Sequence, residues 1–270
     1  YYSDYHTHTN FSTDSNANMV DMIEKAAQLG MKEIAITDHI DFDYPDPNYP
    51  FLYDYEDFKK SIDACKDIYK HKIKVLSGVE IGYQPHVQED IEKFIKNGNF
   101  EFIICSTHST DKKDICDKAF FEGKTKQEAY NQYLDDIINC IKNFDNFNIY
   151  GHLDYIIRYC SYEDNKMNLS EFSEKIDEIL KLLISKGKGI EVNTSGLRYG
   201  VGSPHPSFEI IQRYHSLGGE IITIGSDAHK PEHIGYKFDI AYELLDKAGF
   251  KYVTIFKNRK PDFIKLSNLI

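Results

Sequence analysis

Short apolar segments alternate with longer amphipathic segments along the whole chain. The apolar segments predict β-strands near residues 2–6, 33–37, 74–81, 101–106, 147–151, 189–193, 220–225 and 252–256. Between them, apolar positions at helical spacing predict helices near residues 18–29, 54–70, 87–97, 125–144, 169–186, 206–217 and 237–247. This succession is typical of seven or eight strand–helix units, and therefore of an α/β fold.

Nothing in the sequence divides this series into separate units. A length of 270 residues allows either two small domains or one α/β barrel. Because no linker, repeat or low-complexity stretch interrupts the pattern, residues 1–270 are expected to form a single domain. The longest irregular stretch, residues 41–54, contains three prolines among aromatic residues and is either a lid or a rigid crossover.

Composition and charge narrow the possible partners. A hydrophobic content of 41% is enough for a sizeable core, and the formal net charge of −11 argues against non-specific nucleic-acid binding. A small anionic substrate remains possible, because bound metal ions can reverse the charge of a site. The five cysteines contain no C-x-x-C pair, and no apolar run is long enough to span a membrane. A cytoplasmic protein is therefore expected, with its oligomeric state left open.

Six of the eleven histidines lie at or just beyond the C-terminal ends of predicted strands. These are His6, His8, His39, His108, His152 and His229. Three carboxylates, Asp14, Glu80 and Asp227, occupy comparable positions. The strand ends of a parallel barrel converge on one face, where active sites are found. Imidazole and carboxylate together suit Zn, Fe or Mn, so we expect a catalytic metal cluster there.

Each histidine taken alone has a structural alternative. His39 could be a core residue bonded to Asp38, His108 could cap a following helix, and His152 could hold its own loop together. It is the joint occurrence at strand ends that favours a metal cluster. Three further histidines fall in predicted helices or at helix ends and are interpreted as surface residues: His71, His86 and His215.

The motifs around these positions resemble the ordered signatures of the polymerase and histidinol phosphatase (PHP) superfamily. They are Tyr5-His-Thr-His8 with Ser12 and Asp14, Ile36-Thr-Asp-His39, Gly78-Val-Glu80, Ser106-Thr-His108, Gly151-His152 and Gly225-Ser-Asp-Ala-His229. The resemblance covers residues 4–235 and agrees in order, spacing and residue type. It implies a distorted (β/α)7 TIM-like barrel that holds three divalent metal ions.

The resemblance also implies how the metal ligands are shared. His6, His8, Glu80 and Asp227 surround the first metal; Glu80, His108 and His152 hold the second; Asp14, His39 and His229 hold the third. Many members of the superfamily have histidine at the position of Asp14. The carboxylate resembles the histidinol-phosphatase branch and leaves the identity and occupancy of the third metal open.

The expected reaction is hydrolysis of a small phosphate monoester, with L-histidinol phosphate of histidine biosynthesis as the leading substrate. A hydroxide shared by the metals would attack phosphorus, with Glu80, Asp227 and His229 as the catalytic ligands. Two arginines in strand-end loops, Arg158 and Arg198, are expected to bind phosphate oxygens through their forked donors, although each could instead pair with a surface acid.

Other contacts and functions stay open at this level. Lys230 and His233 follow the last ligand and could touch substrate, and Asp41 or Asp43 could meet the amine of histidinol phosphate. The alternative functions are a PHP-type phosphodiesterase or nuclease, and a catalytically silent metal-binding domain. The acidic balance, the single-domain length, Asp14 and the two arginines favour the monoester.

Overall fold

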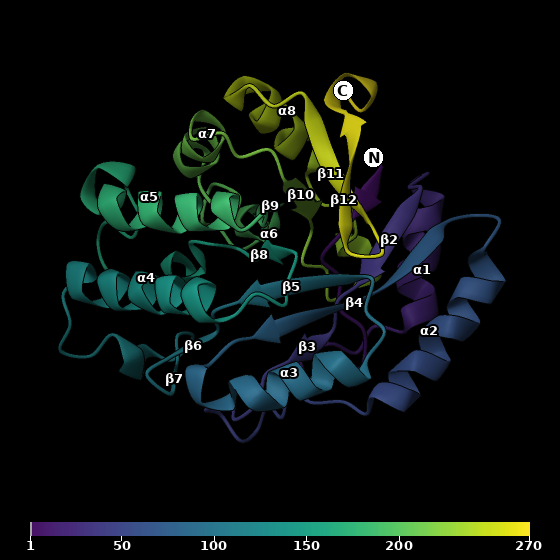
Figure 1. Cartoon of the computed structure of the whole chain (residues 1–270), viewed down its shortest axis with the longest axis horizontal. Helices are drawn as coiled ribbons and strands as arrows, with labels where there is room; N and C mark the ends of the chain where they lie inside the picture. Colours follow the sequence, from purple (N-terminus) through teal and green to yellow (C-terminus); the bar gives the residue numbers. More distant parts are fainter. Residues whose placement is uncertain (1) are drawn as a thin grey trace.

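The computed structural model describes residues 2–270, and its central element is a sheet of eight parallel strands (Figure 1). Seven of them follow the order β1 (Ser3–Asp4), β2 (Glu33–Ile36), β4 (Lys74–Gly82), β5 (Phe102–Ser106), β8 (Ile149–Tyr150), β9 (Gly189–Asn193) and β10 (Ile222–Gly225). The short strand β3 (His39–Ile40) follows β2 in the chain and pairs in parallel with the same neighbour, β4, further along it.

The two ends of this strand order meet. The backbone N–H of Tyr5 donates to the carbonyl of Ile224 at 3.1 Å, and Thr7 forms a parallel bridge with Ala228. The sheet is therefore nearly closed as a seven-stranded barrel, which confirms the fold class expected from the sequence.

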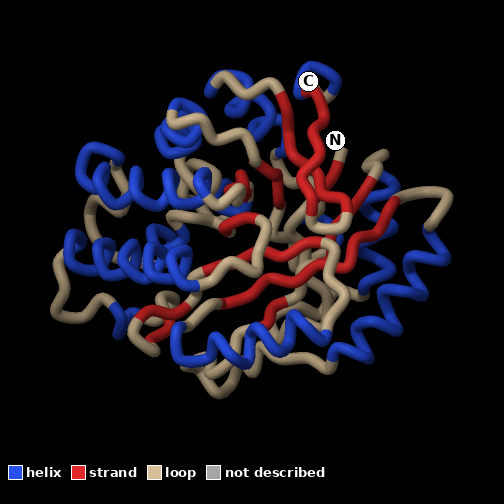
Figure 2. Tube along the Cα trace, in the orientation of Figure 1, coloured by secondary structure: helices blue, strands red, loops and turns tan. Residues whose placement is uncertain are grey.

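Helices surround the barrel and cover its outer face (Figure 2). They are α1 (Met19–Gln28), α2 (Tyr55–Tyr69), α3 (Gln88–Asn97), α4 (Lys126–Asn143), α5 (Leu169–Ser185), α7 (Phe208–Ser216) and α8 (Phe238–Ala248), with α6 (Ser195–Arg198) a single turn. All seven helices predicted from the sequence are present. Short 3-10 turns occupy Pro85–Val87, Lys118–Phe120, Tyr155–Arg158, Pro231–His233 and Leu266–Asn268. None of the helices in residues 2–270 has the length and apolar character needed to cross a membrane.

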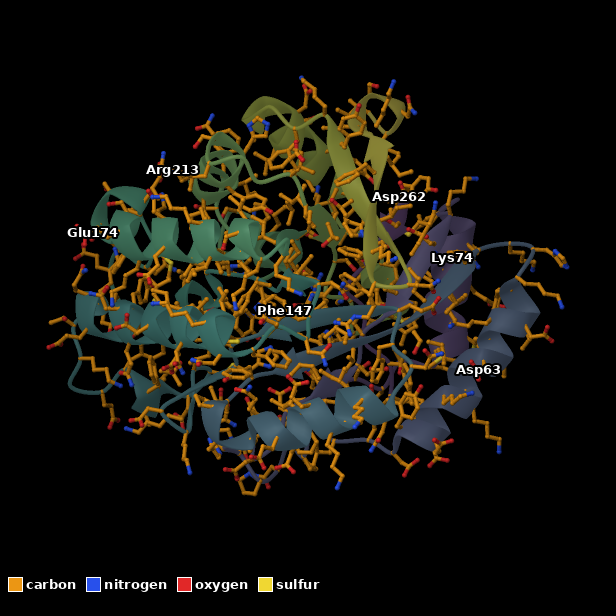
Figure 3. All side chains as sticks on the ribbon, viewed as in Figure 1. Asp63, Lys74, Phe147, Glu174, Arg213 and Asp262 are labelled. Atoms are coloured by element: carbon orange, nitrogen blue, oxygen red, sulfur yellow. The ribbon has the colours of Figure 1, made fainter. Side chains whose placement is uncertain are left out.

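Local chemistry explains where several helices begin. Thr125 and Glu128 form a reciprocal capping box at the start of α4, and the carboxylate of Asp54 accepts two backbone N–H groups at the start of α2. Charged side chains such as Asp63, Glu174 and Arg213 project from the outer surfaces of the helices (Figure 3). The barrel helices are thus amphipathic, with apolar faces toward the sheet.

Two apolar clusters make up the core. The larger cluster fills the space between the strands and the surrounding helices. The smaller cluster lies inside the barrel and consists of Tyr5, Ala35, Leu76, Phe102, Ile104, Ile149, Ile255 and Phe256. Its members come from strand residues that point inward, together with two residues near the C-terminus.

Those two residues belong to an antiparallel hairpin, β11 (Tyr252–Lys257) and β12 (Lys260–Lys265). The strand predicted at residues 252–256 is therefore present, but it pairs with β12 and does not extend the parallel sheet. Its two-residue turn, Asn258-Arg259, has positive φ at both positions (48° and 65°), the geometry of a tight hairpin.

The hairpin covers the N-terminal end of the barrel. The backbone N–H of Phe256 donates to the Tyr5 hydroxyl at 2.7 Å, and the N–H of Arg259 donates to the carbonyl of Glu101, at the start of β5. Closing this end with apolar side chains leaves the opposite, C-terminal face as the open one. A second hairpin, β6 (Ser109–Thr110) and β7 (Lys113–Asp114), rises from that open face directly after β5.

Candidate metal centre

All nine residues proposed as metal ligands lie at the C-terminal face of the barrel. A pocket of about 630 Å³ opens there, and six of the nine line it: Asp14, His39, His108, His152, Asp227 and His229. The other three, His6, His8 and Glu80, lie beneath and are fully buried. Residues separated by more than 200 positions in sequence therefore form one cluster, as the strand-end positions predicted.

Glu80 lies at the centre of this cluster, near the end of β4. Its Oε2 atom is 3.1 Å from Nε2 of His6 and 3.4 Å from Nε2 of His8. Its Oε1 atom is 3.1 Å from Nε2 of His108 and 3.0 Å from Nε2 of His152. One carboxylate thus faces two separate pairs of imidazoles, which is the arrangement of a bridging ligand.

Asp227 closes the cluster on the β10 side. Its Oδ1 atom lies 3.7 Å from Nε2 of His6, 3.4 Å from Nε2 of His8 and 3.6 Å from Nδ1 of His229. The backbone of Asp227 has a φ of 53°, a left-handed conformation that few side chains adopt. Arg198 supports this strained loop, because its guanidinium donates to the carbonyls of Ser226 and Asp227 at 3.1 and 2.9 Å.

The third group stands nearest the pocket. Asp14 lies 3.0 Å from Nε2 of His229 and 3.8 Å from Nε2 of His39. The ring of His8 stacks between those of His39 and His229, with centroid distances of 4.2 Å on each side. Nitrogen atoms of these three histidines lie within 4.8 Å of one another.

The cluster fits divalent metal ions in two respects. Nε2 of His8, Nδ1 of His39 and Nε2 of His229 are buried and make no hydrogen bond of good geometry in the described part of the chain, although carboxylate oxygens lie 3.0 to 3.4 Å from each of them. Two donors on one tetrahedral zinc are about 3.4 Å apart, given metal–nitrogen distances of about 2.1 Å. The imidazole–carboxylate distances around Glu80 and Asp227, from 3.0 to 3.7 Å, bracket this separation.

Electrostatics keep the carboxylates of the cluster ionised. Burial opposes ionisation of Glu80, but the charges of His6, His39 and His108 outweigh it and hold the pKa of this carboxyl well below its usual range. Burial, together with the charges of His229 and His39, lowers the pKa of His8 to about 3. Ionised Glu80 and neutral His8 are the forms that bind metals, whereas neighbouring carboxylates raise the pKa values of His6 and His108, which would lose their protons when a metal binds.

A second set of buried groups orients these histidines and was not identified from the sequence. Glu191 on β9 lies 2.9 Å from Nδ1 of His6 and accepts the backbone N–H of His152 at 2.8 Å. Asp41 lies 2.7 Å from Nδ1 of His108. The strand alternation at residues 189–193 points Glu191 into the barrel, and this alternation was the signal that could have revealed it.

The structure shows different surroundings from those of the structural alternatives considered for His39 and His108. The carboxylate of Asp38 accepts bonds from Thr9 and Ser12, and His108 precedes the strand β6 where a capped helix would have been needed. His152 faces Glu80 with its ring.

The three histidines interpreted as surface residues lie outside the cluster. His71 and His86 are exposed, whereas His215 is half-buried with its ring 4.7 Å from that of Phe250.

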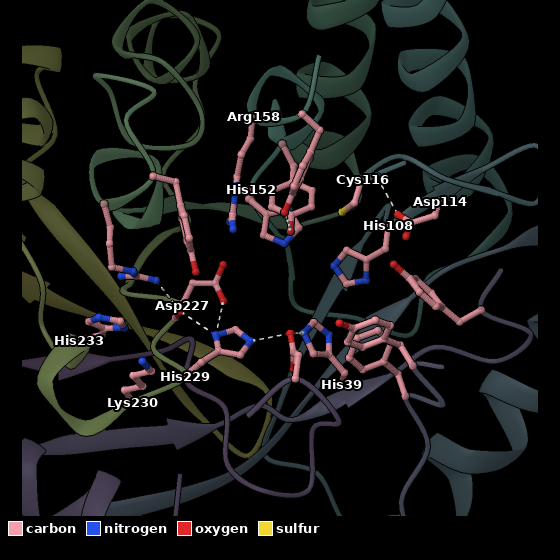
Figure 4. Close-up of a pocket in the computed structure, with 18 residues that line it drawn as sticks. His39, His108, Asp114, Cys116, His152, Arg158, Asp227, His229, Lys230 and His233 are labelled. Carbon is pink, nitrogen blue, oxygen red and sulfur yellow. Dashed lines mark hydrogen bonds and ion pairs between the residues drawn. The ribbon is translucent and has the colours of Figure 1, made fainter. Parts of the chain in front are cut away.

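The expected phosphate-binding residues line the pocket above the cluster (Figure 4). Arg158 packs across the ring of Tyr199, with its guanidinium carbon 3.2 Å from the ring centroid. Lys230 and His233 lie on one side of the pocket, where burial and the charge of Arg198 lower the pKa of His233. Neither arginine forms a salt bridge with a carboxylate within residues 2–270, so both guanidinium charges remain available.

Residues 41–54 form part of the opposite wall. Tyr44, Tyr49 and Phe51 line the pocket, and the loop is fastened by a hydrogen bond from the Thr13 hydroxyl to the carbonyl of Pro50. The amide of Gln84 donates to two further carbonyls of the loop, at residues 42 and 43. In this conformation the loop is thus tied to residues 13 and 84 and forms a wall of the pocket.

Fold and site together define a class of protein: parallel barrels whose C-terminal face carries clustered imidazoles and carboxylates that could bind metal, beneath a pocket with arginines. Comparisons with known proteins place the chain within this class. The PHP domain family model matches residues 4–195. The chain therefore belongs to the PHP family.

The relatives point to one branch of the family. Histidinol-phosphatase of Lactococcus lactis is 33% identical over 265 residues, covering 98% of this chain and 97% of that protein. A probable histidinol-phosphatase of Clostridium acetobutylicum is 33% identical over 93% of this chain and 95% of its own length.

Solved structures agree with these relatives. The crystal structure of the Lactococcus lactis histidinol phosphate phosphatase, complexed with zinc, L-histidinol and phosphate, superposes with a TM-score of 0.89 at 32% identity, over 97% of this chain and 98% of that one. A putative histidinol phosphatase of Listeria monocytogenes shares the fold, with a TM-score of 0.79 at 20% identity over 88% of this chain and 99% of that one.

Proposed function

We propose that this chain is a metal-dependent phosphomonoester hydrolase that converts L-histidinol phosphate and water to L-histidinol and phosphate. The observation that carries the proposal is the buried carboxylate of Glu80 between two imidazole pairs, beneath a pocket that contains Arg158 and Arg198. The full-length similarity to a histidinol-phosphatase supports the choice of substrate.

The proposed ligands form three sets, two of which share Glu80. They are His6, His8, Glu80 and Asp227; Glu80, His108 and His152; and Asp14, His39 and His229. Zn, Fe and Mn all accept these donors, and zinc in the related structure supports zinc among them. When bound, such metals polarise phosphoryl oxygens and lower the pKa of water toward neutrality.

The chain's own residues hold these groups and the substrate in place. Glu80, Asp227 and His229 act as catalytic ligands: Glu80 joins the two imidazole pairs beneath the pocket, whereas Asp227 and His229 line the pocket itself. Arg158 presents its guanidinium to the phosphate, while Arg198 keeps donors free after two carbonyl bonds. Lys230 and His233 complete the cationic side of the pocket.

The acidic net charge bears on the class of partner, and the five free cysteines bear on the cellular compartment. A charge of −11 disfavours a nucleic-acid backbone as partner and favours a small phosphate ester. Free thiols at Cys65, Cys105, Cys116, Cys140 and Cys160 are typical of the reducing cytoplasm, where we place the protein.

The test is phosphate release by metal-replete protein from L-histidinol phosphate, other amino-alcohol and sugar phosphates, and a short single-stranded DNA. We expect L-histidinol phosphate to give the highest kcat/KM. A preference for DNA would instead identify a nuclease of the same family. Bound metal without turnover of any substrate would identify a silent metal-binding domain.

A further inference from the structure

The wall of the pocket opposite Lys230 and His233 contains a carboxylate that the metal cluster does not use. Three acidic residues line the pocket: Asp14, Asp114 and Asp227. Asp14 and Asp227 belong to the proposed ligand sets. Asp114 lies across the pocket from the cationic side, next to Cys116 (Figure 4).

The second hairpin fixes the position of Asp114 relative to the metal centre. Ser109, the residue after His108, pairs with Asp114 across β6 and β7. The turn between these strands has positive φ at both Asp111 and Lys112 (51° and 56°), as a tight two-residue turn requires. The end of β7 lies beside His108, because the backbone N–H of Ile115 donates to the His108 carbonyl at 3.2 Å. Asp114 is therefore anchored beside a metal ligand.

The surroundings leave the charge of Asp114 without a cationic partner. Its Oδ1 atom accepts the backbone N–H of Cys116 at 2.7 Å, and no lysine, arginine or histidine of residues 2–270 forms a salt bridge with it. The neighbouring Tyr44 presents a neutral hydroxyl, because burial and the charge of Asp114 raise its pKa, and burial likewise raises the pKa of the Cys116 thiol to about 12. A half-buried carboxylate among neutral groups is a site for a cation.

The two acids that the sequence suggested as partners of a substrate amine, Asp41 and Asp43, do not face the pocket in this way. Asp41 is buried behind His108 and bonds to its Nδ1 atom. Asp43 is directed to His86, 2.7 Å away, and is not among the residues lining the pocket. Of the acids that face the pocket, Asp114 alone lies outside the proposed ligand sets.

We propose that Asp114 is the binding site for the ammonium group of the substrate, so that the pocket is specific for phosphate esters of amino alcohols. This inference rests on the proposed function, which places the phosphate over the metal cluster and the arginines. The substrate then spans the pocket, with its anionic end at Arg158 and its cationic end at Asp114. Such a charge-assisted contact selects against esters that lack the amine.

The test compares L-histidinol phosphate with its deamino analogue, which carries hydrogen in place of the amine. Asp114→Asn keeps the size of the side chain and the acceptor for the Cys116 N–H, but removes the charge. We expect kcat/KM for L-histidinol phosphate to fall at least about tenfold, with the analogue nearly unchanged. Asp111→Asn, at an exposed acid in the turn of the same hairpin, is the matched control and should behave as wild type.

Binding of the product separates this inference from the proposed function. Calorimetric titration of L-histidinol into the metal-loaded protein requires no turnover, and Asp114→Asn should weaken that binding at least about tenfold. If L-histidinol phosphate is not hydrolysed but L-histidinol binding still depends on Asp114, the proposed function fails and the ammonium site stands. Equal loss on both substrates, or unchanged values on both, would overturn the role of Asp114. Absence of L-histidinol binding by the wild-type protein would overturn the ammonium site, whereas the proposed function is decided by phosphate release alone.

Discussion

Glu80 is fully buried, yet its two oxygens face imidazoles on every side. Nitrogens of five histidines lie within 3.4 Å of its carboxylate: His6, His8, His39, His108 and His152. An isolated buried carboxylate would take up a proton, so the low pKa of this group results from the charges of three of these histidines, His6, His39 and His108. The same environment that keeps Glu80 ionised makes it suited to join two metals.

Glu80→Gln should therefore abolish turnover of L-histidinol phosphate. An amide is a neutral and weaker metal ligand, and the first and second ligand sets would both lose their shared anion. Metal content measured by elemental analysis should fall together with phosphate release. Glu174→Gln, on the exposed surface of α5, is the control and should change neither quantity. Turnover like that of the wild type in Glu80→Gln would refute the bridging assignment.

Glu191 acts one step further from the metals, through His6. Its carboxylate is 2.9 Å from Nδ1 of His6, so it fixes the ring with Nε2 toward Glu80 and Asp227. Space for this carboxylate depends on Gly225, where an added Cβ would lie 2.9 Å from Oε2 of Glu191. A glycine within the final motif thus serves the positioning of the first histidine.

Glu191→Gln should weaken metal binding about 10- to 100-fold without unfolding the protein, because the amide keeps the volume but loses the charge that orients His6. Competition with a chromophoric chelator measures the affinity, and excess metal should restore most of the turnover. Unchanged metal affinity would show that Glu191 serves only the packing of the barrel.

Sequence reasoning found the nine clustered residues but missed Glu191 and gave Asp41 a different role, at the substrate amine, and the difference is physical. Strand-end positions can be recognised along the chain, because every parallel strand presents its C-terminal end at the same face. Which acid approaches Nδ1 of a given histidine depends on neighbouring strands and on inward or outward direction. Those relations exist only after the barrel has closed.

At the scale of elements, the C-terminal hairpin is the main departure from the predicted series. The segment 260–265 reads Lys-Pro-Asp-Phe-Ile-Lys, with little apolar alternation and an internal proline that is tolerated on an edge strand. The partner strand β11 was predicted. The pairing of β11 with β12, however, depends on the turn at Asn258 and on contacts with the N-terminal end of the barrel. The buried residues Ile255 and Phe256 join the smaller core cluster, so this hairpin closes the N-terminal end of the barrel as a plug.

Phe256→Ala should destabilise the protein by about 3–5 kcal/mol, the usual range for removing a buried phenylalanine ring. Phe256 is 2% exposed and its ring lies 5.1 Å from that of Phe102 inside the barrel. Urea unfolding measures the change, and kcat of the folded enzyme should remain, since the plug lies at the face opposite the metals. Phe263→Ala, at a site that is 41% exposed on the same hairpin, should cost far less. Equal losses for the two variants would contradict the plug.

For the whole molecule, the sequence predicted the class of fold and seven of the parallel strands, since helix and strand periodicities alternate along the chain, but it did not predict the short strand β3. It did not predict how the barrel closes between β10 and β1, which depends on single contacts such as Tyr5 N–H to the Ile224 carbonyl. The proposed ligands come from segments at the ends of β1, β2, β4, β5, β8 and β10, and so span this closure. Metal ions bound there would connect the first and last strands of the barrel.

Chelation should consequently lower both turnover and thermal stability. A ligand that binds only the folded state at 100 times its Kd stabilises that state by about 2.7 kcal/mol, which for a chain of this size corresponds to roughly 5–10 °C in Tm. Differential scanning fluorimetry with and without chelator measures the shift, and Zn²⁺ or Mn²⁺ added back should restore Tm together with phosphate release. Glu80→Gln should show a smaller chelator shift, because it has already lost the anion that two metals share. A Tm and a turnover that both withstand complete removal of metal would contradict a metal cluster that closes the barrel and carries the reaction.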